Sequence, residues 1–240
     1  MRVPRALLVG SLVLNVLLLG GAVAVLVHLP EISDYFVAQA AARRATQFAV
    51  LSPQEAGGGA AVAARSGPIV FLGDSITEGG IWSELFPGAP VRNRGIGGDT
   101  TRRLLARLDD IHRLAPRRIF LMIGVNDLNA GLPLAETEAN LRSLLDDLAR
   151  NLPWTEVVVQ SVLPVDDRWR GRADNAGILA INQILKREAA SRGLRYVDLQ
   201  PLFRGPDGQL RRELSNDGIH LLGPGYEIWR QAIAPLVAAP

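Results

Sequence analysis

The chain contains no cysteine, only three histidines and one lysine, Lys186. The scarcity of cysteine and histidine limits the classes of chemistry that the protein can carry out. Without cysteine there is no disulfide, no thiol nucleophile and no cysteine-ligated metal. The formal net charge of +2 is too small to indicate a nucleic-acid partner. No two histidines have the spacing of metal ligands. The sequence therefore excludes thiol chemistry and argues against a metal centre.

The N-terminal segment differs in composition from the rest of the chain. Arg2 and Arg5 precede an apolar run from Ala6 to Val27, which is interrupted only by glycines and two small polar residues. Such a run reaches the roughly 20 residues that a membrane-spanning helix needs. Because the arginines precede the run and acidic residues follow it, the positive-inside rule places the N-terminus in the cytoplasm. We predict an uncleaved transmembrane anchor over residues 1–30.

A cleaved signal peptide is the alternative, because Ala38-Gln39-Ala40 has the small-x-small form of a cleavage site. That site lies about ten residues beyond the apolar run, which favours the anchor. Residues 31–67 then connect the anchor to the rest of the chain. Glu31 to Leu51 is predicted as a juxtamembrane helix, and the glycine-containing stretch from Pro53 to Gly67 as a flexible linker.

From residue 68 to residue 240, short apolar runs alternate with stretches of helical periodicity. This alternation predicts one α/β domain, a three-layer α/β/α sandwich around parallel strands. The predicted strands are 69–72, 90–93, 118–123, 156–162 and 195–198. The predicted helices lie near 100–113, 134–150, 174–192 and 224–237.

Four polar segments follow these predicted strands or precede the last helix, where functional residues collect in parallel sheets. They are Asp74-Ser75, the glycine-rich Arg94–Thr101, Gly124–Asp127 and Asp217–His220. Each also has a structural interpretation, since Gly, Asp, Asn and Ser are common turn residues. In that interpretation Asp99 or Thr100 caps the helix that follows. Asp217 caps a helical turn, and His220 is an ordinary surface histidine.

Taken together, the segments supply the groups that acyl transfer needs. A serine hydroxyl requires a base within hydrogen-bond reach, and the base requires a carboxylate that fixes its tautomer. Asp217 and His220 are three residues apart, so one turn can bring the carboxylate to the imidazole Nδ1. His28 lies at the membrane boundary and His112 within a charged helix, which favours His220. Ser75, His220 and Asp217 are therefore a candidate triad.

A tetrahedral intermediate also needs hydrogen-bond donors aimed at its oxyanion. The N–H of Gly98, which no side chain obstructs, and the carboxamide of Asn126 are candidates beside the N–H of Ser75. Asp74 and Asp99 are better suited to organising loops than to catalysis.

On these residues the chain resembles the SGNH, or GDSL-type, hydrolase superfamily, whose name records its Ser, Gly, Asn and His. The matching blocks are Gly73–Thr77, Gly98 before Asp99, Gly124–Asp127 and Asp217–Leu221. The stretch Gly95–Thr101, with Trp82 upstream, is similar to the platelet-activating-factor acetylhydrolase branch. The resemblance extends from Ile69 to about Trp229, with the four blocks in the family's order.

The resemblance implies a flavodoxin-like sheet of five parallel strands in the order 2-1-3-4-5, and ester hydrolysis without a metal or cofactor. By that resemblance Ser75 is the nucleophile, His220 the general acid and base, and Asp217 its orienting partner. Ser75, Gly98 and Asn126 would form the oxyanion hole. The N-terminal anchor departs from the minimal family pattern, and this bears on location rather than on chemistry.

The leading expectation is an esterase acting on small acyl esters or lysophospholipid-type esters. It would be a single-pass protein of a bacterial inner membrane, with a periplasmic or extracellular catalytic domain. The alternatives are a carbohydrate O-acetylesterase and a non-catalytic envelope binding protein, and, for location, secretion after signal cleavage. The loop Asp166–Arg172 follows the fourth predicted strand and is expected near the active face, where its tryptophan and arginines suit a polar headgroup or a sugar. No residue is assigned to substrate binding.

Overall fold

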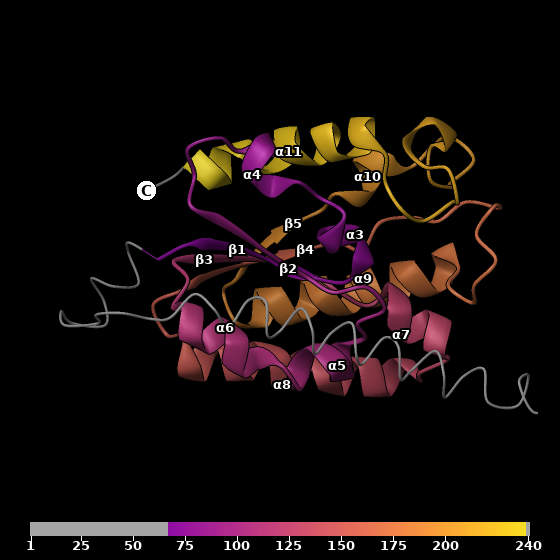
Figure 1. Ribbon diagram of the computed structural model, residues 1–240. Coiled ribbons are helices and arrows are strands. Elements are labelled where there is room, and N and C mark those ends of the chain that lie inside the picture. Colours follow the sequence, from indigo (N-terminus) through magenta and orange to yellow (C-terminus); the bar gives the residue numbers. More distant parts are fainter. Residues whose placement is uncertain (1–66, 239–240) are drawn as a thin grey trace, which may run out of the picture. The chain divides into compact units, whose positions relative to one another are not determined.

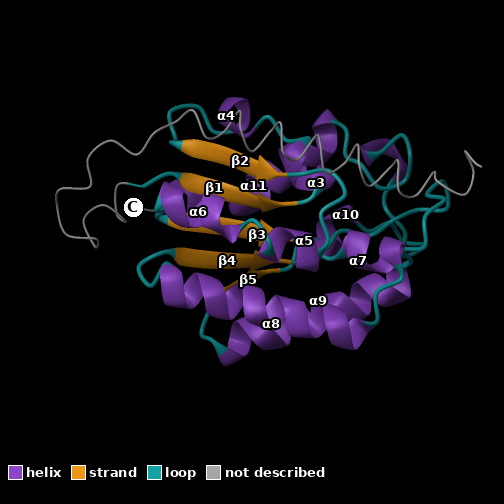
Figure 2. Ribbon diagram, turned by 60° about the horizontal axis from the view of Figure 1, so that its bottom comes forward, coloured by secondary structure: helices purple, strands orange, loops and turns teal. Residues whose placement is uncertain are grey.

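The computed structural model describes residues 67–238, which form a parallel sheet with helices on both faces (Figure 1). The strands are β1 (Ile69–Gly73), β2 (Val91–Gly95), β3 (Arg118–Met122), β4 (Glu156–Gln160) and β5 (Arg195–Val197). Their order across the sheet is β2-β1-β3-β4-β5, and every neighbouring pair is parallel (Figure 2). This confirms the predicted three-layer α/β architecture and its strand order.

Helices cover both faces of this sheet. They are α3 (Ser75–Glu78), α4 (Trp82–Leu85), α5 (Thr101–Leu105), α6 (Leu108–Leu114), α7 (Val125–Ala130), α8 (Leu134–Asn151), α9 (Asn175–Ser191), α10 (Gln200–Phe203) and α11 (Gly223–Ala238), with the 3-10 turn η1 (Arg212–Leu214). Both ribbon views place α4 and α11 on one face of the sheet, and α5, α6, α8 and α9 on the other (Figures 1 and 2). The central strands β1 and β3 are therefore buried along their whole length, which explains why their sequences are largely apolar.

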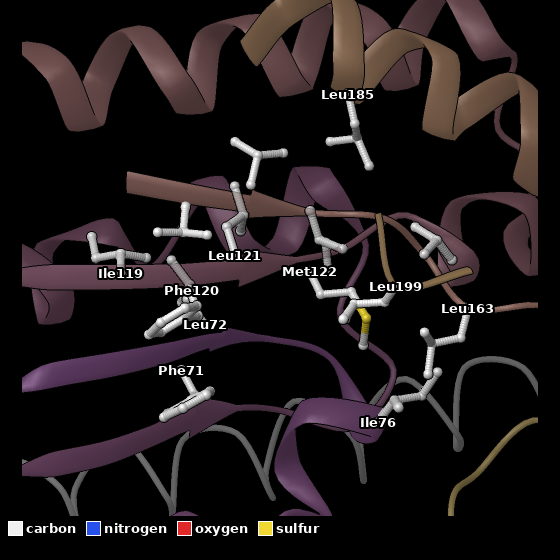
Figure 3. Packing of buried hydrophobic residues seen from close by; sticks show 14 of the residues in the cluster. Phe71, Leu72, Ile76, Ile119, Phe120, Leu121, Met122, Leu163, Leu185 and Leu199 are labelled. Carbon is white, nitrogen blue, oxygen red and sulfur yellow. The ribbon is translucent and has the colours of Figure 1, made fainter. Parts of the chain in front are cut away.

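An aromatic cluster joins the sheet to the α4 and α11 layer. The ring of Phe71 on β1 stacks on Trp82 of α4, with centroids 3.9 Å apart, and on Phe120 of β3 at 5.1 Å. The ring of Trp229 on α11 meets Trp82 edge-on at 4.9 Å. Figure 3 shows Phe71 and Phe120 among the apolar side chains that the strands contribute to the core. This packing holds α4 and α11 against β1 and β3.

The helical stretch predicted near 100–113 consists of two short helices in the structure, α5 and α6. Ala106 ends α5, and Arg107 has the non-helical angles φ −123° and ψ 17°. The apolar spacing continues across the break, so periodicity alone could not reveal it. The break turns the side chain of Arg107 toward the ends of β1 and β2, where it binds backbone carbonyls.

The predicted anchor and the predicted juxtamembrane helix and linker lie outside the described residues, apart from Gly67. Within residues 67–238, no helix combines the length and hydropathy that crossing a bilayer requires.

Candidate active site

Ser75 lies at the turn between β1 and α3. Asp74 is the N-cap of α3, and its Oδ1 accepts a hydrogen bond of 3.0 Å from the N–H of Ile76. Gly73 is required by close packing, because a Cβ there would stand 2.3 Å from both the carbonyl oxygen of Met122 and Oγ1 of Thr77. The tight turn leaves Ser75 partly exposed at the carboxyl edge of the sheet. Ser75 thus stands at the strand-to-helix turn where the sequence predicts it.

Asp217 and His220 lie in the loop between η1 and α11, and the structure brings both to Ser75. Nε2 of His220 is 2.9 Å from Oγ of Ser75, and Nδ1 of His220 is 2.6 Å from Oδ2 of Asp217. Oδ1 of Asp217 accepts the backbone N–H groups of Ile219 at 3.0 Å and His220 at 2.9 Å. The carboxylate therefore fixes both the backbone turn and the imidazole ring.

The hydrogen bonds around Asp217 determine its charge. Partial burial acts to raise the pKa of Asp217, but hydrogen bonds from the His220 side chain and from the two backbone N–H groups lower it well below its usual range. An ionised carboxylate accepts hydrogen bonds only, so Nδ1 of His220 must donate to it. In the neutral imidazole, Nε2 is then an acceptor, and the Ser75 hydroxyl donates to it.

The two further candidate segments follow the strands on either side of β1. Gly98 lies between β2 and α5 with φ +77°, and Asn126 lies in the first turn of α7, directly after β3. The order β2-β1-β3 places both segments beside the Ser75 turn. Nδ2 of Asn126 donates one hydrogen bond of 3.0 Å to the carbonyl of Asp99, which leaves its second N–H available. Among residues 67–238, the N–H groups of Ser75 and Gly98 have no protein acceptor.

Three buried aspartates lie beneath this edge of the sheet. Burial raises the pKa of Asp74 to about 7, against the opposing effect of the Ile76 hydrogen bond. Burial also raises the pKa values of Asp99 and Asp127. Asp99 is paired with Arg107, and Asp127 accepts the backbone N–H of Thr101 at 2.9 Å. These contacts agree with an organising role for Asp74 and Asp99.

Trp169 also borders the site. The sequence predicts that its loop lies near the active face but does not predict that its ring contacts His220. Its ring meets the ring of His220 edge-on, with centroids 6.4 Å apart, and its Nε1 donates to Oδ1 of Asn129 at 3.2 Å. The same loop packs against Gly218, where a Cβ would lie 2.6 Å from the backbone nitrogen of Trp169. The loop therefore supports the segment that carries Asp217 and His220.

Metal-binding side chains do not gather anywhere in the described part of the chain. Residues 67–238 contain no group of three or more His, Asp or Glu side chains arranged to hold a metal ion.

Comparisons with known proteins agree with this geometry. The sequence profile of the GDSL-like lipase/acylhydrolase family matches residues 71–228. The human platelet-activating factor acetylhydrolase IB subunit alpha2 is 29% identical over 166 residues, which cover 66% of this chain and 70% of that protein. The bovine alpha1 subunit is 27% identical over 168 residues, covering 66% of this chain and 69% of that subunit.

Solved structures show the same likeness. A structure from Streptococcus pneumonia is 28% identical with a TM-score of 0.75, and the match covers 86% of this chain and 97% of that one. A GDSL-like lipase from Bacteroides thetaiotaomicron is 26% identical with a TM-score of 0.68, covering 81% of this chain and 95% of the lipase.

The fold and the comparisons define an esterase of the SGNH, or GDSL, type. The chain belongs to the GDSL-like lipase/acylhydrolase family, and its relatives place it in the branch that resembles the platelet-activating-factor acetylhydrolases.

Proposed function

We propose that the chain hydrolyses carboxylic esters with Ser75 as nucleophile, His220 as general base and Asp217 as the partner that orients His220. The observation that carries this proposal is the unbroken pair of hydrogen bonds, 2.9 Å from Ser75 to His220 and 2.6 Å from His220 to Asp217. In the first step Oγ of Ser75 attacks the ester carbonyl carbon while Nε2 of His220 takes the hydroxyl proton. The ionised Asp217 stabilises the imidazolium that forms.

The tetrahedral intermediate carries its negative charge on the former carbonyl oxygen. We assign its stabilisation to the N–H groups of Ser75 and Gly98 and the free amide N–H of Asn126. When the intermediate collapses, the bond to the alcohol oxygen breaks and His220 returns the proton to that oxygen. A water molecule, deprotonated by His220, then attacks the acyl-Ser75 ester, and collapse of the second intermediate releases the acid and regenerates the serine.

We propose small acyl esters or lysophospholipid-type esters as substrates. The curated relatives are named as platelet-activating factor acetylhydrolases, which supports an ester of a phospholipid type. The side chains of His220 and Asp217 are 45% and 48% exposed, so the site is open to solvent. An open site suits an ester presented by a large or aggregated molecule.

A carbohydrate O-acetylesterase is the second candidate, and Trp169 is the observation that favours it. An indole held beside the general base is the kind of surface on which a sugar ring stacks. The acetyl group of an O-acetylated sugar would then be the acyl group that Ser75 receives.

The location of this activity is also a proposal. The apolar run from Ala6 to Val27 supports an N-terminal anchor in a bacterial inner membrane, with the catalytic domain on the periplasmic or extracellular side.

The test is hydrolysis by the full chain, purified in detergent, of p-nitrophenyl esters of graded acyl length, a lysophosphatidylcholine and an O-acetylated xylooligosaccharide. Ser75→Ala and His220→Ala should each lower kcat by roughly 10²-fold or more on the preferred ester. The substrate with the highest kcat/KM decides between the lipid and carbohydrate proposals.

Matched controls separate chemistry from folding. Ser83→Ala changes an exposed serine on α4, and His112→Ala changes a histidine that pairs with Asp147 far from the loop of His220. Both should keep kcat within about twofold of the wild type. Full activity in folded Ser75→Ala would refute the proposal.

A further inference from the structure

The side chain of Arg107 binds backbone or side-chain groups of three segments that meet at the active edge of the sheet. Its Nη2 donates to the carbonyl of Gly73 at 3.2 Å and to the carbonyl of Arg94 at 2.9 Å. Its Nε donates to Oδ2 of Asp99 at 2.6 Å. One guanidinium therefore joins the end of β1, the end of β2 and the loop that precedes α5.

Two of these three acceptors lie close in the chain to a group proposed to act in catalysis. The carbonyl of Gly73 is two residues before Ser75, and Asp99 directly follows Gly98. The backbone carbonyl of Asp99 also accepts the 3.0 Å hydrogen bond from the amide of Asn126. The guanidinium is thus connected to the Gly98 and Asn126 segments of the proposed oxyanion hole through Asp99, and to the Ser75 segment through Gly73.

Burial makes this connection rigid. Asp99 is 4% exposed, and the side chain of Arg107 is 15% exposed, so water competes weakly for their contacts. The planar fork of an arginine can reach several acceptors at fixed angles, which the single ammonium of a lysine cannot do. The break between α5 and α6 is what allows this side chain to turn back toward the sheet.

We propose that Arg107, acting through Asp99, is a positioning residue that sets the N–H of Gly98 and the amide of Asn126 against the oxyanion formed at Ser75. This inference rests on the proposed function. Oxyanion donors are effective only when they are held in place before the reaction, and a misplacement of about 1 Å can cost roughly 100-fold in rate. A stabilising ion pair alone would not act on the transition state in this way.

The test is a double-mutant cycle in the full chain, purified in detergent and assayed on p-nitrophenyl acetate. Arg107→Gln should lower kcat by roughly 10–100-fold and leave KM within about twofold, because it disturbs the transition state more than the bound ester. In the Asn126→Ala background the same substitution should lower kcat by a factor several-fold smaller than in the wild type, since one of the two donors that it positions is already absent. Arg113→Gln, on an exposed arginine of α6 that pairs with Asp110, is the matched control and should leave kcat unchanged.

Equal losses in both backgrounds would overturn the inference, because a purely structural ion pair gives additive effects. Unchanged kcat in folded Arg107→Gln would also overturn it. If Arg107→Gln does not fold, Asp99→Asn replaces it in the cycle, because it removes the ion pair and keeps the carbonyl that binds Asn126. If turnover by the wild type does not depend on Ser75, the proposed function fails and this inference fails with it; Ser75-dependent turnover that is insensitive to Arg107 refutes the inference alone.

Discussion

Asp74 directly precedes the proposed nucleophile Ser75, and its buried position makes its carboxyl group costly to ionise. Its carboxylate caps α3 and is 1% exposed, and Asp99 and Asp127 lie close enough to add repulsion. Burial is the largest effect and raises the pKa of Asp74 to about 7. The folded state therefore holds this proton at pH values where the unfolded chain has released it.

This difference predicts a pH-dependent stability that Asp74→Asn removes. Between the unfolded pKa near 4 and the folded pKa near 7, the folded state binds more protons, so the free energy of unfolding falls as the pH rises. From pH 4.5 to pH 7.5 the contribution of Asp74 amounts to a loss of about 3 kcal/mol. Urea unfolding of the wild type and of Asp74→Asn at both pH values measures the difference directly.

The asparagine is a close control, because its carbonyl oxygen can still accept the N–H of Ile76 and keep the cap of α3. The wild type should lose stability relative to Asp74→Asn as the pH rises. A stability difference that stays constant over this range would show that Asp74 is ionised normally in the folded protein.

Residues of the candidate site were predictable where their signal is local. Ser75 follows an apolar strand, and Asp217 and His220 are three residues apart, so short patterns identified them. Arg107 lacked such a signal, and for Trp169 the sequence indicated only that its loop lies near the active face. Their contacts join segments far apart in the chain, and one arginine among many gives no pattern that marks it.

At the scale of elements, the strands were the most predictable parts. β1 and β3 are central in the sheet and fully buried, so both appear in the sequence as uninterrupted apolar runs. The short helices α4, α7 and α10 were not predicted, because four to six residues are too few to show helical periodicity. Tertiary contacts hold such helices in place.

Trp82 makes the contacts that hold α4 against the sheet. It is 1% exposed, its ring stacks on Phe71 at 3.9 Å, and its Nε1 donates to the carbonyl of Thr77 at 2.9 Å. We expect Trp82→Ala to lower the free energy of unfolding by about 3–5 kcal/mol, because it opens a cavity between α4 and the sheet. Chemical denaturation of the two proteins measures this loss.

Trp154 offers a matched control for this substitution. Its side chain is 64% exposed, and Trp154→Ala should change the free energy of unfolding by less than about 0.5 kcal/mol. Similar losses for the two tryptophans would mean that α4 does not depend on the aromatic cluster.

At the scale of the whole molecule, the proposed division is an anchor over residues 1–30, a connecting segment over 31–67 and the hydrolase domain over 68–240. The described residues 67–238 contain every side chain assigned to the chemistry. We therefore propose that the N-terminal part determines the cellular location of the activity. The hydrolase domain then carries out the cleavage of the ester.

The anchor proposal predicts that the full chain sediments with bacterial membranes and resists extraction by alkaline carbonate, because a spanning helix is held by its burial in lipid. Immunoblots of the pellet and supernatant, with a chain lacking residues 1–59 as the soluble control, measure this. A soluble mature form beginning near residue 41 would instead establish signal cleavage.

The central claim is that Ser75, activated by His220, forms the covalent intermediate, and a covalent serine probe tests it most directly. We would incubate the full chain with diethyl p-nitrophenyl phosphate, follow release of p-nitrophenolate, and locate the adduct by peptide mass spectrometry. One diethylphosphoryl group per chain, on Ser75, formed at least roughly 100-fold more slowly in His220→Ala, is the predicted result. Labelling of another residue, or equal rates in wild type and folded His220→Ala, would contradict the assignment.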